Sequence, residues 1–292
     1  MDAPALRLNI EKWNQTGIVG YVALGSTGER VHLDERECLE VIETARGAVP
    51  DHLAFIVGAG QQSTRATVNE VRQCAGAGAD AVLVITPHFY RTAITQSALV
   101  NHYVEVADAS PVPVLLYSMP EFTGITLAPE TVARLSEHEN IIGIKDSSGD
   151  VINLTETLRL VPEDFAVLTG NGALLYAALS AGVQGAILAA GCVAPHQTVA
   201  IYRAVQSGDH KRARDLQRRL TPLARAVTVR YGIGGLKAAL DILGYVGGTV
   251  RAPLEAASEE ARREIARLLE EAAIDSDEAA KGNEQRLAGA TE

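Results

Sequence analysis

The chain has 292 residues, 47% of them hydrophobic, and a formal net charge of −10 at pH 7. This length and apolar content allow a large buried core, including a single α/β barrel domain. Because nucleic acids and anionic membranes are bound by concentrated basic charge, the acidic balance excludes both as expected partners and favours a small molecule.

The first predicted element is a helix at residues 4–15, which places Leu6, Ile10 and Trp13 on one face. Seven short apolar runs follow, and each is succeeded by a turn and a longer amphipathic stretch. Continuous rather than alternating hydrophobicity is typical of strands that are covered on both faces, as in a parallel sheet. The runs span residues 18–24, 53–58, 80–86, 113–117, 141–145, 166–169 and 184–189.

The amphipathic stretches between these runs have the spacing and length of crossover helices. Examples are residues 35–48, 64–76, 96–109 and 129–137. Such a regular repeat suits a closed (β/α)8 TIM barrel better than a doubly wound sheet. A barrel needs eight strands, whereas seven runs are visible. We therefore predict an α/β TIM barrel whose first strand is missing from the chain, which would leave a costly open edge.

Further helices are predicted after the last run, at residues 194–206, 209–228, 233–243 and 257–273. The remaining segment is polar, poor in aromatic residues and without a periodic apolar face, a composition typical of disorder. The predicted organisation is a barrel lacking its first strand at 1–206, C-terminal helices at 207–273 and a disordered tail at 274–292.

In TIM barrels the active site lies at the C-terminal ends of the strands. Lys145 stands at the end of one predicted strand, directly before Asp146. A buried ammonium group loses hydration, which favours the neutral amine and makes it a nucleophile toward carbonyl groups. Position alone also allows a lysine that only closes the strand and reaches water or pairs with Asp146.

Three other strand ends carry candidate groups. The loop Gly25–Glu29 offers hydroxyls and free backbone N–H groups that suit a small anion such as a carboxylate, although such residues are also ordinary in turns. Tyr117 ends another run, where its phenol could move protons or simply pack. The turn Gly170–Gly172 indicates backbone close to a ligand or a plain tight turn.

Other kinds of site are disfavoured. Cys38, Cys74 and Cys192 are far apart, and the histidines show no metal-ligand spacing. No complete dinucleotide or P-loop motif is found, so we expect neither a metal nor an organic cofactor. With no leader-like N-terminus and no long apolar run, the expected location is the cytoplasm. We interpret Lys237, in a late helix, as solvated or structural.

In combination, three motifs resemble the dihydrodipicolinate synthase and N-acetylneuraminate lyase family of class I aldolases. They are Gly25–Glu29, then Tyr117 with Pro120 and the pair 123–124, then residues 143–146. The resemblance extends from residue 4 to residue 272. It implies a (β/α)8 barrel with C-terminal helices, usually a homotetramer, in which a lysine forms a Schiff base with pyruvate. The family pattern begins with a strand ahead of the first helix.

Carried over to this chain, the resemblance implies that Lys145 is the Schiff-base nucleophile and Tyr117 the proton shuttle. Ser26 and Thr27 would hold the pyruvate carboxylate. The chemistry is consistent with these roles, because a protonated imine is an electron sink through which a carbon–carbon bond can form or break.

Two departures bear on the second substrate. Dihydrodipicolinate synthases typically carry an arginine where this chain has Phe122, and a relay tyrosine where it has Phe89, although Tyr90 lies beside it. Residues around Tyr117 and Lys145 and the segment 230–237 look most like the 4-hydroxy-2-oxoglutarate aldolase branch. In that branch Ser147 would help to bind the glyoxylate end.

Our main hypothesis is a pyruvate-dependent aldolase that cleaves 4-hydroxy-2-oxoglutarate, or a similar 2-keto-4-hydroxy acid, to pyruvate and glyoxylate or another small aldehyde. The first alternative is a dihydrodipicolinate synthase that condenses pyruvate with aspartate semialdehyde. The second is a non-catalytic protein that binds a keto acid, since an incomplete barrel could retain a pocket without catalytic precision. We expect a homo-oligomer, either tetramer or dimer.

Overall fold

The computed structural model describes residues 1–272 and contains seven strands in this part of the chain. They are β1 (Gly20–Ala23), β2 (Ala54–Ala59), β3 (Ala81–Ile85), β4 (Val114–Ser118), β5 (Ile141–Asp146), β6 (Ala166–Thr169) and β7 (Gly185–Ala186). Each strand lies within an apolar run predicted to be a strand, with three small exceptions. β2, β4 and β5 each end one residue beyond their runs. The predicted and observed strands differ most in length at β7, where only two residues of the run 184–189 are strand.

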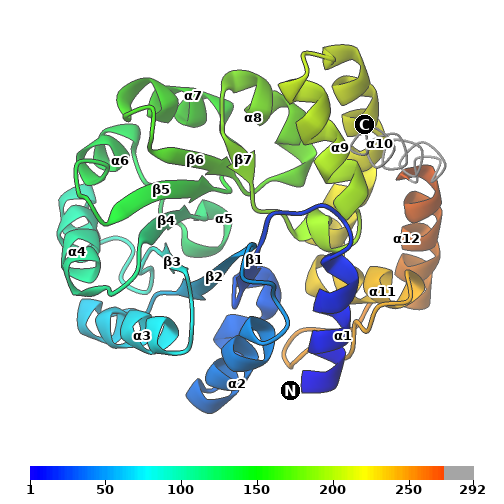
Figure 1. Cartoon of the computed structure of the whole chain (residues 1–292), viewed down its shortest axis with the longest axis horizontal. Coiled ribbons are helices and arrows are strands. Elements are labelled where there is room, and N and C mark those ends of the chain that lie inside the picture. The colour runs from blue at the N-terminus through cyan, green and yellow to red at the C-terminus, as the bar shows by residue number, and fades with distance from the viewer. Residues whose placement is uncertain (273–292) are drawn as a thin grey trace, which may run out of the picture.

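The seven strands form one parallel sheet in the order β1-β2-β3-β4-β5-β6-β7. In Figure 1 they follow a C-shaped curve from β1 round to β7, and the opening faces α1 and α9. The predicted barrel of parallel strands with C-terminal helices is confirmed. Seven described strands agree with the seven predicted runs, whereas the absence of a first strand from the protein stays a prediction.

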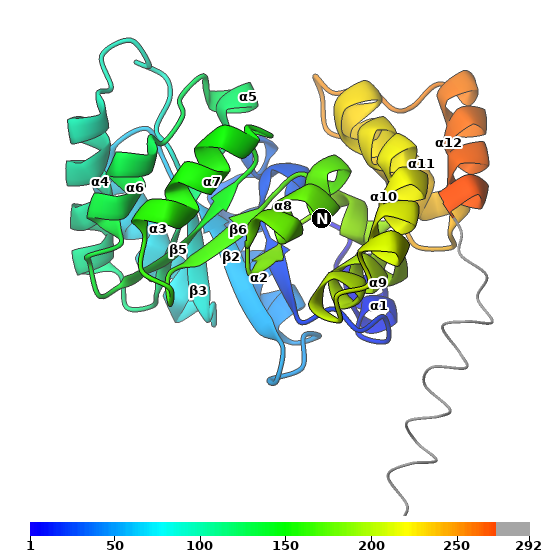
Figure 2. The ribbon, with the colours of Figure 1, turned by 90° about the horizontal axis from the view of Figure 1, so that it is seen from above.

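Most of the helices cover the outside of the sheet (Figures 1 and 2), whereas the short helix Pro120–Thr123 lies within the curve of the strands in Figure 1. The helices of the barrel are α1 (Ala3–Trp13), α2 (Glu35–Arg46), α3 (Thr64–Gly76), α4 (Gln96–Ala109), α5 (Pro120–Thr123), α6 (Pro129–Leu135), α7 (Val151–Leu160) and α8 (Leu175–Ala181). Short 3-10 helices are η1 (Ser26–Gly28), η2 (Arg30–His32), η3 (Gly172–Leu174) and η4 (Ala189–Cys192).

The C-terminal helices are α9 (Pro195–Gln206), α10 (His210–Arg225), the π-helical turn η5 (Ala226–Arg230), α11 (Gly232–Ile242) and α12 (Glu259–Ala272). They stand together at one side of the barrel (Figure 2). The domain division at residue 206 stays a prediction, and the tail predicted to be disordered lies outside the described residues. No helix within residues 1–272 has the length and apolar content needed to cross a bilayer.

Several barrel helices begin at the residues that their capping chemistry favours. The side chains of Ser63, Thr95 and Asp150 each accept hydrogen bonds from backbone N–H groups in the first turns of α3, α4 and α7. Asp34 and Glu37 form a reciprocal capping box at the start of α2. These caps fix where the loops after β1, β2, β3 and β5 must end.

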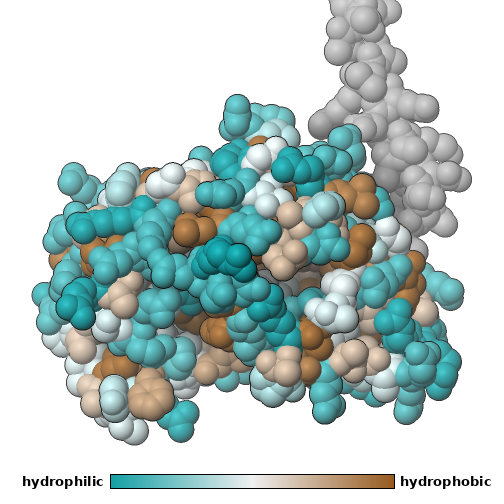
Figure 3. Space-filling model, turned by 90° about the horizontal axis from the view of Figure 1, so that it is seen from below, coloured by the Kyte–Doolittle hydropathy of each residue, from teal (hydrophilic) through white to brown (hydrophobic). Residues whose placement is uncertain are grey.

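Alternation along the strands divides the apolar residues into two cores. The large cluster lies between the sheet and the helices and includes Val82, Val84 and Ile144. A smaller cluster contains Ala81, Leu83, Leu115 and Tyr117, which come from alternate positions of β3 and β4. The face shown in Figure 3 is mostly hydrophilic, with hydrophobic residues in small separate patches.

His102 of α4 predicts a pH dependence of stability. Its ring is buried and burial lowers its pKa from 6.5 to about 4. Nδ1 lies 3.0 Å from Thr64 Oγ1, whereas Nε2 is buried and has no partner within residues 1–272. The unfolded chain therefore binds more protons than the folded chain between pH 6.5 and 4. We expect His102 to lower the free energy of unfolding by about 3 kcal/mol across this window as the pH falls.

The measurement is urea unfolding at several pH values between 7.5 and 4, comparing the wild type with His102→Asn. Asparagine can keep a polar group near Thr64 but does not titrate. Other titrating groups are common to both proteins, so the difference between the curves isolates His102. Parallel curves would contradict the prediction.

Candidate active site

Lys145 and Tyr117 lie side by side at the C-terminal ends of two adjacent strands. The parallel register of β4 and β5 pairs Tyr117 with Lys145. Because Ile144 packs in the outer core, its neighbour Lys145 points to the opposite face, toward the inside of the barrel. Lys145 Nζ lies 4.3 Å from the centre of the Tyr117 ring, and both residues are buried, with exposures of 8% and 4%.

Asp146 does not neutralise this lysine. Its carboxyl accepts hydrogen bonds from the backbone N–H (2.8 Å) and the hydroxyl of Ser148 instead. Burial raises the pKa of Asp146, and these hydrogen bonds oppose the rise. Within residues 1–272 Lys145 has no carboxylate partner, so the interpretation of a Lys145–Asp146 pair is wrong.

The predicted anion loop reaches the same place from β1. Ser26 begins η1, and its Oγ lies 3.2 Å from Tyr117 Oη. Thr27 is the next residue of the same turn. Gly58 of β2 allows the close approach of this loop, because a Cβ there would stand 2.7 Å from the carbonyl carbon of Leu24 and nearer still to its oxygen.

Ser147 and Gly170 complete the surroundings of the lysine. The Ser147 N–H donates to Ser118 O (2.9 Å), which places Ser147 directly beyond the strand end. A Cβ at Gly170 would lie 2.9 Å from Lys145 Cε and 2.9 Å from Ser147 Cβ. Gly170 therefore borders both side chains, and only a glycine leaves them room there.

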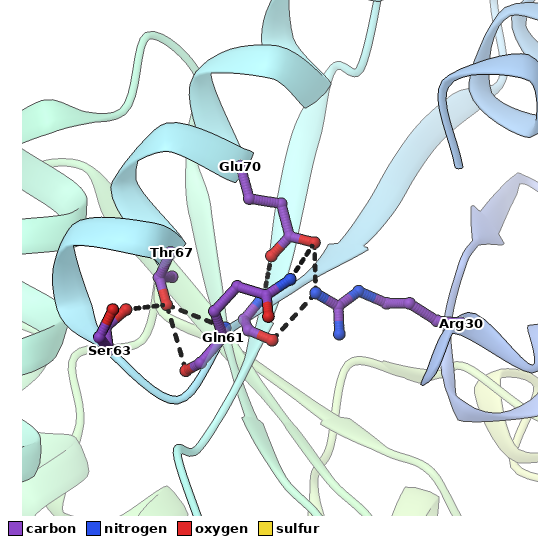
Figure 4. A network of polar contacts seen from close by, with 6 residues as sticks. Arg30, Gln61, Ser63, Thr67 and Glu70 are labelled. Atoms are coloured by element: carbon purple, nitrogen blue, oxygen red, sulfur yellow. Dashed lines mark hydrogen bonds and ion pairs between the residues drawn. The ribbon is translucent and has the colours of Figure 1, made fainter. Parts of the chain in front are cut away.

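A polar network beside the anion loop connects η2 to the end of β2 and to α3 (Figure 4). Arg30 pairs with Glu70 and donates to Gly60 O (2.9 Å). Glu70 in turn accepts from the Gly60 N–H (2.8 Å), and Thr67 Oγ1 accepts from the Gln61 N–H (2.9 Å). The network keeps the chain after Ser26 and Thr27 against the mouth of the barrel.

The structure thus brings together Lys145, Tyr117, Ser26 and Ser147, and Thr27 lies next to Ser26 in the chain. The close approach of the turn Gly170–Gly172 to a ligand stays a prediction; the structure shows that Gly170 leaves room for the side chains of Lys145 and Ser147. Sequence reasoning assigned no role to Glu29. Its carboxylate is buried and pairs with Lys237, and no local pattern could have indicated a partner so far away in the sequence.

A parallel barrel with a buried lysine beside a tyrosine at neighbouring strand ends has the architecture of the class I aldolases. A model of the dihydrodipicolinate synthetase family matches residues 1–272. The chain belongs to this family and is an enzyme of the class I pyruvate aldolase type. The alternative of a non-catalytic keto-acid-binding protein is accordingly not supported.

Curated relatives and solved structures agree with the family. A 4-hydroxy-tetrahydrodipicolinate synthase of Syntrophus aciditrophicus is 35% identical over 270 residues, which cover 92% of each chain. One of Haloarcula marismortui is 36% identical over 89% of this chain and 84% of its own. The crystal structure of dihydrodipicolinate synthase from Thermotoga maritima has a TM-score of 0.89 and 31% identity, over 93% of each chain. These comparisons do not single out the 4-hydroxy-2-oxoglutarate aldolase branch.

Proposed function

We propose that Lys145 forms a Schiff base with pyruvate. The observation that carries this proposal is the burial of the Lys145 amine against Tyr117, with the Ser26 hydroxyl 3.2 Å from the Tyr117 phenol. An amine held at this place can add to the carbonyl carbon of a bound keto acid. Ser26 and Thr27 bind the pyruvate carboxylate through hydroxyl and backbone N–H groups.

The reaction then follows from the imine. The Lys145 amine adds to the pyruvate carbonyl, and water leaves to form a protonated imine. Loss of a proton from the methyl carbon gives an enamine, whose carbon forms a bond to an aldehyde; the reverse sequence breaks that bond. Tyr117 Oη transfers the protons that these steps require, and its contact with Ser26 keeps it oriented.

For the second substrate, we propose cleavage of 4-hydroxy-2-oxoglutarate or a similar 2-keto-4-hydroxy acid, with Ser147 at the glyoxylate end. The observation that favours cleavage is Phe122, which occupies the position where dihydrodipicolinate synthases typically carry an arginine. Its side chain is 63% exposed and offers no charge to a semialdehyde carboxylate. Phe89, 73% exposed and packed edge-on against Tyr90, has no hydroxyl for a proton relay.

The second candidate is the 4-hydroxy-tetrahydrodipicolinate synthase reaction, in which the enamine condenses with aspartate semialdehyde. The names of the relatives favour this candidate over cleavage. The two candidates share Lys145, Tyr117, Ser26 and Thr27 and differ in the aldehyde. Turnover of the two substrates by one preparation separates them, because an enzyme built for one aldehyde has a much higher kcat/KM for it.

The experiment that tests the shared step is trapping with borohydride. We expect the protein incubated with pyruvate and borohydride to gain the mass of one reduced pyruvyl group, and peptide mapping to locate it on Lys145. Borohydride without pyruvate is the control. A folded protein that gains no adduct, or gains it on another lysine, would overturn the proposal.

A further inference from the structure

The anion loop is bounded by two residues with left-handed backbone. Leu24 has φ 55° and Glu29 has φ 54°, and neither is a glycine. Such conformations cost a side-chain-bearing residue free energy and persist where the surroundings hold them. At the first boundary, Leu24 is buried and its carbonyl sits over the bare backbone of Gly58. At the second boundary, other contacts must hold the left-handed backbone of Glu29.

The restraint at Glu29 comes from the C-terminal part of the chain. The Glu29 side chain is 8% exposed and pairs with Lys237 of α11. Its other carboxylate oxygen accepts a hydrogen bond from the Arg251 backbone N–H (2.9 Å). Lys237 Nζ also donates to Thr249 O, so the ammonium joins α11, the segment after it and the loop.

The segment that carries Arg251 is itself attached to the barrel. The Arg251 guanidinium forms two hydrogen bonds with Glu37 of α2 and donates to His32 O (3.2 Å). The hydrogen bonds from Arg251, followed by the one from the Asp34 backbone N–H, hold the pKa of Glu37 down at about 2. Earlier in the same segment, Val246 exchanges two hydrogen bonds of 2.9 Å with the Asn9 side chain of α1. In Figure 1 this segment passes beside α1 and α2.

We propose that Lys237 is a positioning residue for the anion loop. It holds the Glu29 carboxylate, and thereby the left-handed turn that sets Ser26 against Tyr117. Lys237 does not touch the substrate; it acts through Glu29. The inference rests on the proposed function, because it assigns to Lys237 the placement of the hydroxyls that bind the pyruvate carboxylate. The C-terminal helices would then help to shape the active site, because α11 carries Lys237.

The test compares four variants by the pyruvate concentration that gives half-maximal borohydride trapping, together with the rate of trapping at saturating pyruvate. We expect Lys237→Met to raise the half-maximal concentration at least about tenfold, because misplacing a binding loop by a fraction of an ångström is costly. The rate at saturating pyruvate should fall much less, since Lys145 and Tyr117 remain in place. Lys237→Arg, which keeps a cation beside Glu29, should stay near the wild type.

The control is Lys211→Met on α10, where an equally charged side chain pairs with Asp215 at 3.2 Å on the surface. This variant should match the wild type. Breaking one side of a buried ion pair can also unfold a protein, so the folded fraction is measured by circular dichroism. If Lys237→Met is unfolded, the double variant Glu29→Gln/Lys237→Met decides, because it leaves no buried charge without a partner. It should show the same rise in half-maximal pyruvate.

The outcomes separate the two proposals. A wild type that traps no pyruvate overturns the proposed function. In a second outcome the wild type traps pyruvate, and the folded Lys237→Met or double variant has the same half-maximal pyruvate concentration as the wild type. This outcome overturns the role of Lys237 and leaves the proposed function standing. A loss of stability without a change in pyruvate dependence shows a purely structural ion pair and also overturns that role.

Discussion

Replacing Lys145 by methionine should abolish turnover, with a loss on the order of 10⁴-fold or more in kcat, because no other group at the site can form the imine. Methionine has nearly the same length and fills the same space. The lysine is 8% exposed, and its Nζ lies 4.3 Å from the centre of the Tyr117 ring. Because methionine keeps the apolar contacts of the buried side chain, the melting temperature should change little. Steady-state kinetics and thermal unfolding measure the two effects.

The matched control is again Lys211→Met, whose side chain is 85% exposed. We expect wild-type kinetics from it. Activity above about one tenth of the wild type in Lys145→Met would show that the imine does not form at this residue. A large fall in melting temperature would instead show that the ammonium group stabilises the fold through contacts that the methionine cannot make.

Replacing Gly170 by alanine is expected to have the second largest effect. The new Cβ would lie 2.9 Å from Lys145 Cε and closer still to the Ser147 hydroxyl, so both side chains must move. Displacing a reacting group by about 1 Å can cost on the order of 100-fold in rate, and we expect at least that loss in kcat/KM. Overpacking should also lower the free energy of unfolding by about 1–3 kcal/mol.

Gly76→Ala at the end of α3 is the control, since an added Cβ there meets nothing within 4 Å. A second variant separates the two consequences of overpacking. In Ser147→Gly/Gly170→Ala the clash with Ser147 is gone but the contact with Lys145 Cε remains. Stability should recover, whereas activity should not. Wild-type kcat/KM in Gly170→Ala would show that the lysine relaxes freely and that Gly170 does not shape the site.

The barrel strands were predictable because their signal is local. Continuous apolar runs identify strands covered on both faces, and β2 to β6 coincide with such runs to within a residue. Helix ends were less predictable: the helix expected to extend to residue 228 passes into a π-helical turn at Ala226. β7 covers only two residues of the apolar run 184–189, and a 3-10 helix begins at the last residue of that run.

The site was predictable in part for the same reason. Lys145, Tyr117 and Ser26 each stand at the end of a strand or its following loop, where a barrel concentrates its chemistry. Side-chain contacts between distant segments could not be predicted. Glu29 and Lys237 are separated by most of the chain, and each alone resembles an ordinary charged residue. The second substrate, the oligomeric state and the cytoplasmic location stay predictions.

The pairing pattern of the sheet also bears on how the protein is made. Every strand within residues 1–272 pairs only with strands that precede or follow it directly in the sequence, so a chain leaving the ribosome can add one strand and helix at a time. The contacts of Asn9 with Val246, 237 residues apart, cannot form until synthesis is nearly finished. A nascent chain ending after β7 would already contain Lys145, Tyr117 and Ser26, but its anion loop would lack both Lys237 and Arg251. These two restraints on the anion loop can therefore form only after the residues that follow β7 have been made.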